Sequence, residues 1–145
     1  MNKTTKPVLK RENRSRGNTF EAECMKLLAQ NGYFVARLAQ TAAGQPADLI
    51  AVDRKGHSML IDCKLAQTSR LALSRIEPNQ QIALSNFPGV SYLMVGISNK
   101  ASEKLWDIAY LVPWADVLTL LVSNRSNMNQ FFMEKFQKKA WVNEQ

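Results

Sequence analysis

The chain has 145 residues, and its 19 lysines and arginines outnumber its 12 aspartates and glutamates, so its formal net charge is +7 at pH 7. This length suits one domain with its own hydrophobic core. The proportions of hydrophobic (46%) and charged (21%) residues are those of an ordinary globular protein. We expect no membrane span, because no apolar run approaches roughly 20 residues, and no secretory signal, because residues 1–16 lack an apolar segment.

The cysteine and histidine content excludes several kinds of site. Cys24 and Cys63 are the only cysteines, so a disulfide framework or a four-ligand zinc site is not expected, and a reducing cytosol fits best. His57 is the only histidine, which disfavours any mechanism that needs two.

The positive charge is concentrated at the N-terminus, where residues 1–16 supply +5 of the +7. Because this segment has few large apolar side chains, we predict a flexible basic arm over 1–16, followed by one domain over 17–145. Charge alone leaves two interpretations open, a solvated tail or an arm that lies along phosphates and makes binding salt-dependent.

The first half of the chain predicts a helix and three strands. Asn18 or Thr19 can cap a helix that ends at Asn31-Gly32. Apolar and β-branched patterns then predict strands over 33–38, 48–53 and 57–65, with a loop at 39–45 and a tight turn at 54–56. The short turn makes the last two strands an antiparallel hairpin.

The second half continues with alternating strands and helices. After a loop over 65–76, Pro78 begins a helix, and strands follow over 91–98 and 105–112. Pro113 precedes another helix, and 128–139 has the pattern of a last amphipathic helix. This order predicts one α/β domain with a mixed central β-sheet flanked by helices.

The strand predicted over 57–65 carries an acid and a base on one face. Side chains alternate along a strand, so Asp62 and Lys64 share a face, while Cys63 points to the opposite, apolar row. Taken alone, this pair could be a surface ion pair of little consequence.

Asp48 suggests more than an ion pair. It begins the preceding strand, and the hairpin could bring it beside Asp62, where opposed side chains lie about 5 Å apart. One of two such carboxylates takes up a proton unless a cation lies between them. Magnesium removes the conflict, because it binds one or two carboxylates together with waters and phosphate oxygens. Lys64 would then face a phosphate or the attacking water.

Glu21 is a third candidate acid. On the first predicted helix it lies at the edge of the apolar stripe that contains Cys24 and Leu28, whereas Glu23 is expected to face water. A solvated first-turn glutamate, favoured by the helix dipole, explains Glu21 equally well on these residues alone.

Together these residues resemble the PD-(D/E)XK nuclease superfamily, and within it the Holliday-junction resolvases of the archaeal and RecU-like groups, phage versions included. The resemblance covers about 17–84 and implies a single restriction-endonuclease-like domain. The motifs that carry it are Glu21, Pro46-Ala47-Asp48, Asp62-Cys63-Lys64 and Asn79-Gln80-Gln81. The chain departs from the family in the placement of Ala47 between Pro46 and Asp48, and in Asp62, where the resolvases usually have Glu.

The resemblance also implies a magnesium-dependent endonuclease, with Mn²⁺ as a possible substitute. It assigns the metal to Glu21, Asp48, Asp62 and the main-chain carbonyl of Cys63. Catalysis falls to Lys64 and Gln81 together with the three acids. Lys64 would stabilise charge on the phosphate and orient the nucleophile, and Gln81 would position it.

Partners follow from the same resemblance. The substrate would be four-way DNA junctions, and paired cuts on opposing strands imply a homodimer. The enzyme would act in the cytoplasm, or in a host's cytoplasm if the chain is phage-encoded. The residues expected to contact DNA, of which Arg37 could equally be an edge arginine, are Lys10, Arg11, Arg14, Arg16, Arg37, Arg70 and Arg75.

Two other functions remain open on the sequence. One is another PD-(D/E)XK endonuclease that acts on duplex or flap DNA. The other is a noncatalytic DNA-binding module, which would keep the basic segment without magnesium-dependent hydrolysis. RNA binding is poorly supported, because the chain has no aromatic RNP-type motif or GXXG loop.

Overall fold

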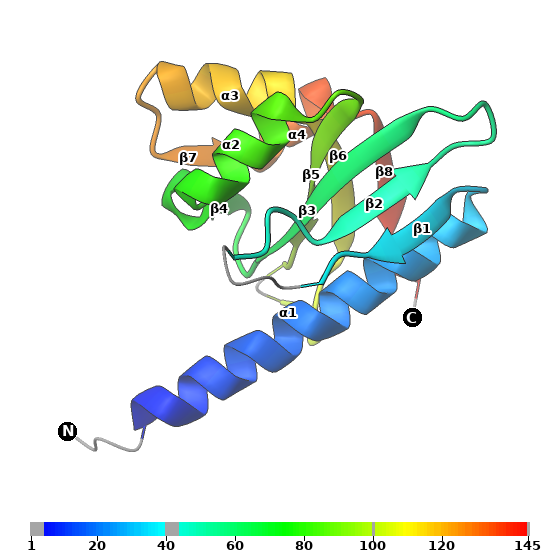
Figure 1. Ribbon diagram of the computed structural model, residues 1–145. Helices are drawn as coiled ribbons and strands as arrows, with labels where there is room; N and C mark the ends of the chain where they lie inside the picture. Colours follow the sequence, from blue (N-terminus) through cyan, green and yellow to red (C-terminus); the bar gives the residue numbers. More distant parts are fainter. Residues whose placement is uncertain (1–4, 40–43, 100, 145) are drawn as a thin grey trace.

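The computed structural model describes residues 5–39, 44–99 and 101–144, with residues 5–14 described by their backbone alone (Figure 1). The basic segment predicted over 1–16 and the loop expected at 39–45 are therefore described only in part. The helices are α1 (Thr5–Gln30), α2 (Pro78–Asn86), α3 (Trp114–Val122) and α4 (Gln130–Phe136). The strands are β1 (Phe34–Arg37), β2 (Leu49–Val52), β3 (Ser58–Ala66), β4 (Arg70–Ala72), β5 (Val90–Ile97), β6 (Ile108–Pro113), β7 (Asn127–Asn129) and β8 (Lys139–Val142).

A mixed six-stranded sheet forms the centre of the molecule, in the order β1-β2-β3-β5-β6-β8. Its neighbouring strands are antiparallel except for β3 and β5, which pair in parallel through the crossover that contains α2. This confirms the predicted α/β domain with a mixed sheet. Within the described residues, every helix is too short or too polar to span a lipid bilayer.

Helices cover both faces of this sheet (Figure 1). On one face, Phe20, Cys24 and Leu28 of α1 pack on β2, β3 and β5. On the other, α2, α3 and α4 enclose a second apolar cluster that contains Leu60 of β3. Since the middle of β3 is covered on both faces, Asp62 on this strand is fully buried.

The close approach of α1 to the sheet depends on a glycine in β5. A Cβ at Gly96 of β5 would lie 2.6 Å from Cε1 of Phe20, well inside contact distance. Glycine at this position lets the Phe20 ring pack flat against the sheet. The end of α1 agrees with the prediction, because Gly32 adopts a φ of +88° directly after it.

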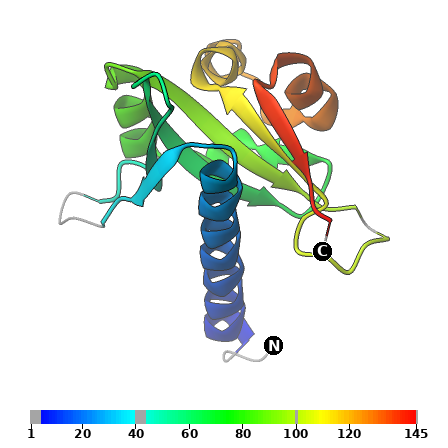
Figure 2. The same ribbon diagram turned by 90° about the vertical axis from the view of Figure 1, so that its right-hand side faces the viewer.

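The start of α1 differs from the prediction. The helix begins at Thr5, so the boundary expected between residues 16 and 17 lies inside it, and its N-terminal half projects beyond the sheet (Figure 2). Thr19 does not cap the helix; its hydroxyl donates to the carbonyl of Ser15, one turn earlier. The flexibility of the basic segment stays a prediction.

The hairpin is the part of the fold that positions the candidate acids. β2 and β3 pair antiparallel with Leu49 opposite Ile61, as predicted. The backbone N–H of Asp48 donates to the carbonyl of Ile61 at 3.1 Å. This register continues the ladder by one residue and sets Asp48 across from Asp62.

Three short strands were missed by the sequence analysis. β4 lies inside the expected 65–76 loop and pairs with β7, where Leu71 faces Met128 and both are fully buried. The last helix is shorter than 128–139, because Gln137 has extended backbone and β8 follows it along β6. The strand expected at 105–112 begins at Ile108.

Candidate active site

Asp62 is a fully buried acid at the centre of the sheet. It lies on β3 between two apolar clusters, and none of its surface is exposed. Its Oδ2 lies 3.2 Å from the Nζ of Lys64, whose side chain is 12% exposed. The two side chains share a face of β3, as the alternation of the strand predicted.

Asp48 lies beside this pair. One of its carboxylate oxygens, Oδ2, accepts the backbone N–H of Cys63 at 2.7 Å. This bond joins the start of β2 to the middle of the Asp62-Cys63-Lys64 motif. The charge of Asp48 also acts on Asp62, which means that the hairpin brings the two carboxylates together.

Burial raises the pKa of Asp62 to about 7. The positive charge of Lys64 opposes that rise, and the negative charge of Asp48 adds to it. A neighbouring Cys24 thiol and burial raise the pKa of Cys63, so this thiol is neutral. The ionisable groups that can carry charge at this site are therefore Asp48, Asp62 and Lys64, and not Cys63.

Gln80 connects the acid and the base. Its Oε1 accepts from Lys64 Nζ at 3.1 Å, and its Nε2 donates to Asp62 Oδ1 at 3.3 Å. The same Oε1 accepts the backbone N–H of Glu77 at 3.0 Å, so the first turn of α2 fixes the side chain. Gln80 therefore holds the Lys64 ammonium against Asp62.

Gln81, the glutamine predicted from the sequence, has a different partner. Its Nε2 donates to the carbonyl of Ile76 at 3.1 Å, whereas Gln80 contacts Lys64 and Asp62, so the role of Gln81 stays a prediction. The signal that identifies Gln80 is its place three residues after Glu77, the residue that caps the helix. A side chain at that position reaches back over the first turn of the helix. Because the first turn of α2 lies beside the motif, Gln80 there contacts Lys64 and Asp62.

Glu21 stands next to this group but has its own partner. Its Oε1 lies 2.8 Å from the Nε of Arg37 at the end of β1. Burial and the charge of Asp48 raise the pKa of Glu21, and Arg37 lowers it. Among the described residues no three acids, cysteines or histidines are gathered closely enough to hold one ion. The structure thus brings Asp48 and Asp62 together and leaves Glu21 paired with Arg37.

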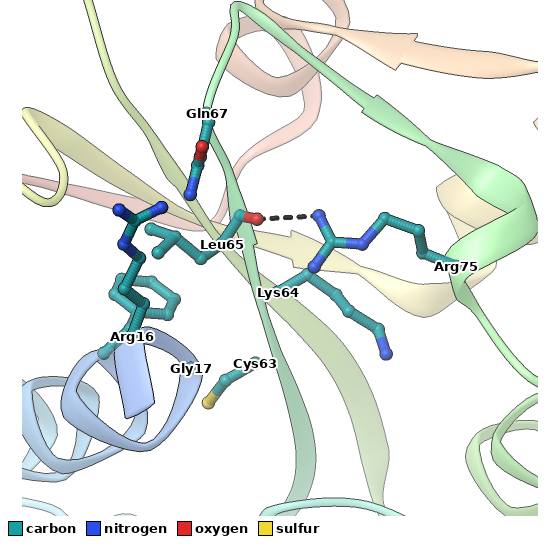
Figure 3. A pocket seen from close by; sticks show the side chains of 8 residues that line it. Arg16, Gly17, Cys63, Lys64, Leu65, Gln67 and Arg75 are labelled. Carbon is teal, nitrogen blue, oxygen red and sulfur yellow. Dashed lines mark hydrogen bonds between the residues drawn. The ribbon is translucent and has the colours of Figure 1, made fainter. Parts of the chain in front are cut away.

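A pocket of about 530 Å³ opens beside the motif (Figure 3). Lys64, Arg16 and Arg75 line it together with Gln67. The Nη1 of Arg75 donates to the carbonyl of Leu65 at 2.7 Å, which holds this guanidinium against β3. Three cations thus border the space next to the acids.

The remaining residues predicted to contact DNA are Arg70, Lys10, Arg11 and Arg14. Arg70 lines a different depression from Lys64. The side chains of Lys10, Arg11 and Arg14 lie outside the described residues, so their contacts stay predictions.

Comparison with known proteins gives the family. The family model of the archaeal Holliday junction resolvase (Hjc) matches residues 12–113, more than half of the chain. The chain belongs to this resolvase family. The match includes both strands of the hairpin, the Asp62-Cys63-Lys64 motif and α2, so the resemblance carried by those residues is confirmed.

Two resolvases of archaea illustrate the relationship. The chain is 31% identical over 81 residues to the crossover junction endodeoxyribonuclease Hjc of Methanocaldococcus jannaschii, an alignment that covers 55% of this chain and 58% of the relative. The resolvase Hjc of Archaeoglobus fulgidus has the same fold, with a TM-score of 0.61 at 16% identity over 83% of this chain and 94% of that one.

The raised pKa of Asp62 predicts how stability depends on pH. Between about pH 4, where an unfolded aspartate titrates, and pH 7, the folded chain keeps a proton that the unfolded chain has lost. Stability therefore falls as the pH rises through this window. We expect Asp62→Asn to gain about 2 kcal/mol or more over wild type between pH 5 and pH 8 in EDTA, measured by urea unfolding.

Asp107→Asn is the matched control, because an aspartate ordinarily titrates below pH 5 and a backbone N–H of Asn99 lowers the pKa of Asp107 further. Its stability relative to wild type should stay flat over the same range. A constant difference between Asp62→Asn and wild type would mean that Asp62 is ionised throughout.

Proposed function

We propose that this chain is a divalent-metal-dependent endodeoxyribonuclease that resolves four-way DNA junctions by paired phosphodiester hydrolysis. One observation carries the proposal within the resolvase family: a lysine ammonium is held between a buried aspartate and a glutamine, beside a second aspartate. A surface ion pair would need neither the burial nor the glutamine.

The donor set fits a hard cation such as Mg²⁺, with Mn²⁺ as a substitute. Apart from the ion pair with Lys64 at 3.2 Å, the buried Oδ2 of Asp62 accepts no hydrogen bond among the described residues. The negative charge of the neighbouring Asp48 makes ionisation of Asp62 still less favourable. Asp48, Asp62 and the main-chain carbonyl of Cys63 would hold the ion, which uses one or two carboxylates in proteins. When bound, the ion supplies a water of lowered pKa and stabilises charge on the phosphate.

In this proposal Lys64 faces the phosphate, and Gln80 positions Lys64. The ammonium, fixed by Asp62 and Gln80, offers a preorganised positive charge to the phosphate oxygen on which negative charge develops. Gln80 limits the rotation of the Lys64 ammonium, because its Oε1 accepts one of the three ammonium protons.

Glu21 can join this site only by exchanging its partner. In this proposal the ion pair between Glu21 and Arg37 opens when Glu21 turns to the metal, and the charge of Asp48 already acts on Glu21. Release of Arg37 would free that guanidinium for a DNA phosphate. One exchange would thus supply a third acidic ligand and a DNA contact.

Substrate, assembly and location are parts of the same proposal. Paired cuts in a four-way junction require a homodimer with twofold symmetry. The enzyme acts in the cytoplasm, and in a host's cytoplasm if it is phage-encoded. Cleavage compared on labelled four-way, flap and linear duplex DNA separates a resolvase from another endonuclease of the superfamily.

Loss of either the metal-binding acid or the lysine should abolish cleavage without abolishing binding. We expect Asp48→Asn and Lys64→Ala to cut a labelled four-way junction in Mg²⁺ at least about a hundredfold more slowly than wild type, a loss typical of removing a preorganised charge. Both should bind the junction in EDTA within a few-fold of wild type.

Wild-type rates in either variant would overturn the assignment of the site. A wild-type chain that binds the junction but cleaves no DNA in Mg²⁺ or Mn²⁺ would favour the noncatalytic DNA-binding module instead.

The two adjacent glutamines provide a matched pair of variants. Gln80→Ala removes both the acceptor of Lys64 and the donor to Asp62, so we expect a loss of about tenfold or more in the single-turnover cleavage rate. Gln81→Ala removes a bond to the backbone of Ile76 and should change the rate by less than about threefold.

Equal losses in the two variants would contradict the positioning role of Gln80. The pH profile of cleavage adds a readout that a merely structural effect would not move, because Gln80→Ala should shift it through Lys64 and Asp62.

A further inference from the structure

Three adjoining depressions extend from the candidate active site along one side of the molecule. The first is the pocket beside Lys64, lined also by Arg16 and Gln67 (Figure 3). The second, of about 400 Å³, shares Arg16 and Gln67 with the first and adds Lys104 and Asn99. A third depression, described next, adjoins the second. We call the surface formed by all three depressions the polar track.

The third depression, of about 600 Å³, completes the polar track. It shares Ser98 and Asn99 with the second and ends at Thr68, Ser69 and Arg70. Each depression therefore adjoins the next, and the shared lining residues link Lys64 at one end of the polar track to Arg70 at the other.

The chemistry of the polar track matches a nucleic-acid backbone. Its side chains are mainly hydroxyls, amides, lysines and arginines, which are the groups that bind phosphate and sugar. Its only aromatic lining residue is Phe20, whose ring is 1% exposed and belongs to the core. The polar track therefore offers phosphate contacts without a surface for base stacking.

Arg70 is placed to act as the far anchor. It is the only cation among the lining residues of the third depression, and no hydrogen bond or ion pair engages its guanidinium among the described residues. Its backbone is fixed, because Arg70 pairs with Asn129 across β4 and β7 and the hydroxyl of Thr68 binds its carbonyl at 2.9 Å. A rigid base thus carries a free positive charge.

Negative charge at this end is limited. Asp107 is the acid that lines the third depression, and it stays ionised because its carboxylate accepts the backbone N–H of Asn99 at 2.6 Å, which lowers its pKa. Glu103 is exposed and lines only the second depression, where Arg16 and Lys104 also lie. Cations outnumber acids along the polar track, with Arg16, Lys64, Arg70, Arg75 and Lys104 against Glu103 and Asp107.

We propose that the backbone of the cleaved DNA strand continues from Lys64 along the polar track and that Arg70 binds one of its phosphates outside the active site. This inference rests on the proposed nuclease function and adds the path of the strand. The contact is to phosphate, so it contributes affinity and register but no base preference.

The test combines an arginine variant with single neutral phosphates. Full-length chain is bound to four-way junctions in EDTA, with a methylphosphonate placed at one position at a time along the strand to be cut. At one or two positions away from the cut we expect a neutral phosphate to weaken wild-type binding about three- to tenfold and to leave Arg70→Gln unaffected. Arg70→Gln should itself bind about three- to tenfold more weakly, with a slope of log K against log salt smaller by about one.

Two further variants serve as controls. Arg70→Lys keeps the charge and should retain most of the affinity and the salt slope. Arg125→Gln removes an exposed arginine that lines none of the three depressions, so its binding should equal that of wild type.

An unchanged affinity and salt slope in Arg70→Gln would overturn the proposal, as would an identical methylphosphonate profile in Arg70→Gln and wild type. Both measurements are made without metal, so they are independent of cleavage. A chain that shows the expected phosphate contact but no hydrolysis in Mg²⁺ would fail the nuclease proposal alone.

Discussion

The site depends on the burial of one negative charge. Asp62 lies inside the sheet, where its carboxylate is costly to ionise and contacts Lys64 and Gln80. The neighbouring carboxylate of Asp48 brings a second negative charge, which makes ionisation of Asp62 still less favourable. Folding thus creates an electrostatic conflict at the motif, and under our proposal a divalent cation would resolve it.

The fold supplies this arrangement through three separate elements. The hairpin sets Asp48 across from Asp62, and the Cys63 N–H ties the Asp48 carboxylate to β3. The crossover after β3 brings the first turn of α2 over the motif, so that Gln80 reaches both charged groups. Since these contacts join β2, β3 and α2, the site forms only when the hairpin is paired and α2 is packed on the sheet.

The sequence could predict what depends on local pattern. Alternation along β3 placed Asp62 and Lys64 on one face, and the short turn after β2 established the hairpin that opposes Asp48. The sequence failed where long-range pairing decides. β4 and β7 are each three residues long, and their pairing buries Leu71 against Met128, which no local pattern indicates. The pairing of Glu21 with Arg37 and the reach of Gln80 likewise come from the packing of helices on the sheet.

The most direct test of this account is the titration of Asp62 itself. Carboxyl chemical shifts of ¹³C-labelled aspartate, assigned with Asp62→Asn, should report a pKa of about 7 for Asp62 in EDTA. Saturating Mg²⁺ should lower that pKa by about two units or more, because the cation favours the ionised form. A pKa near 4 in EDTA, or one that Mg²⁺ does not move, would contradict the claim that burial prepares Asp62 for a metal ion.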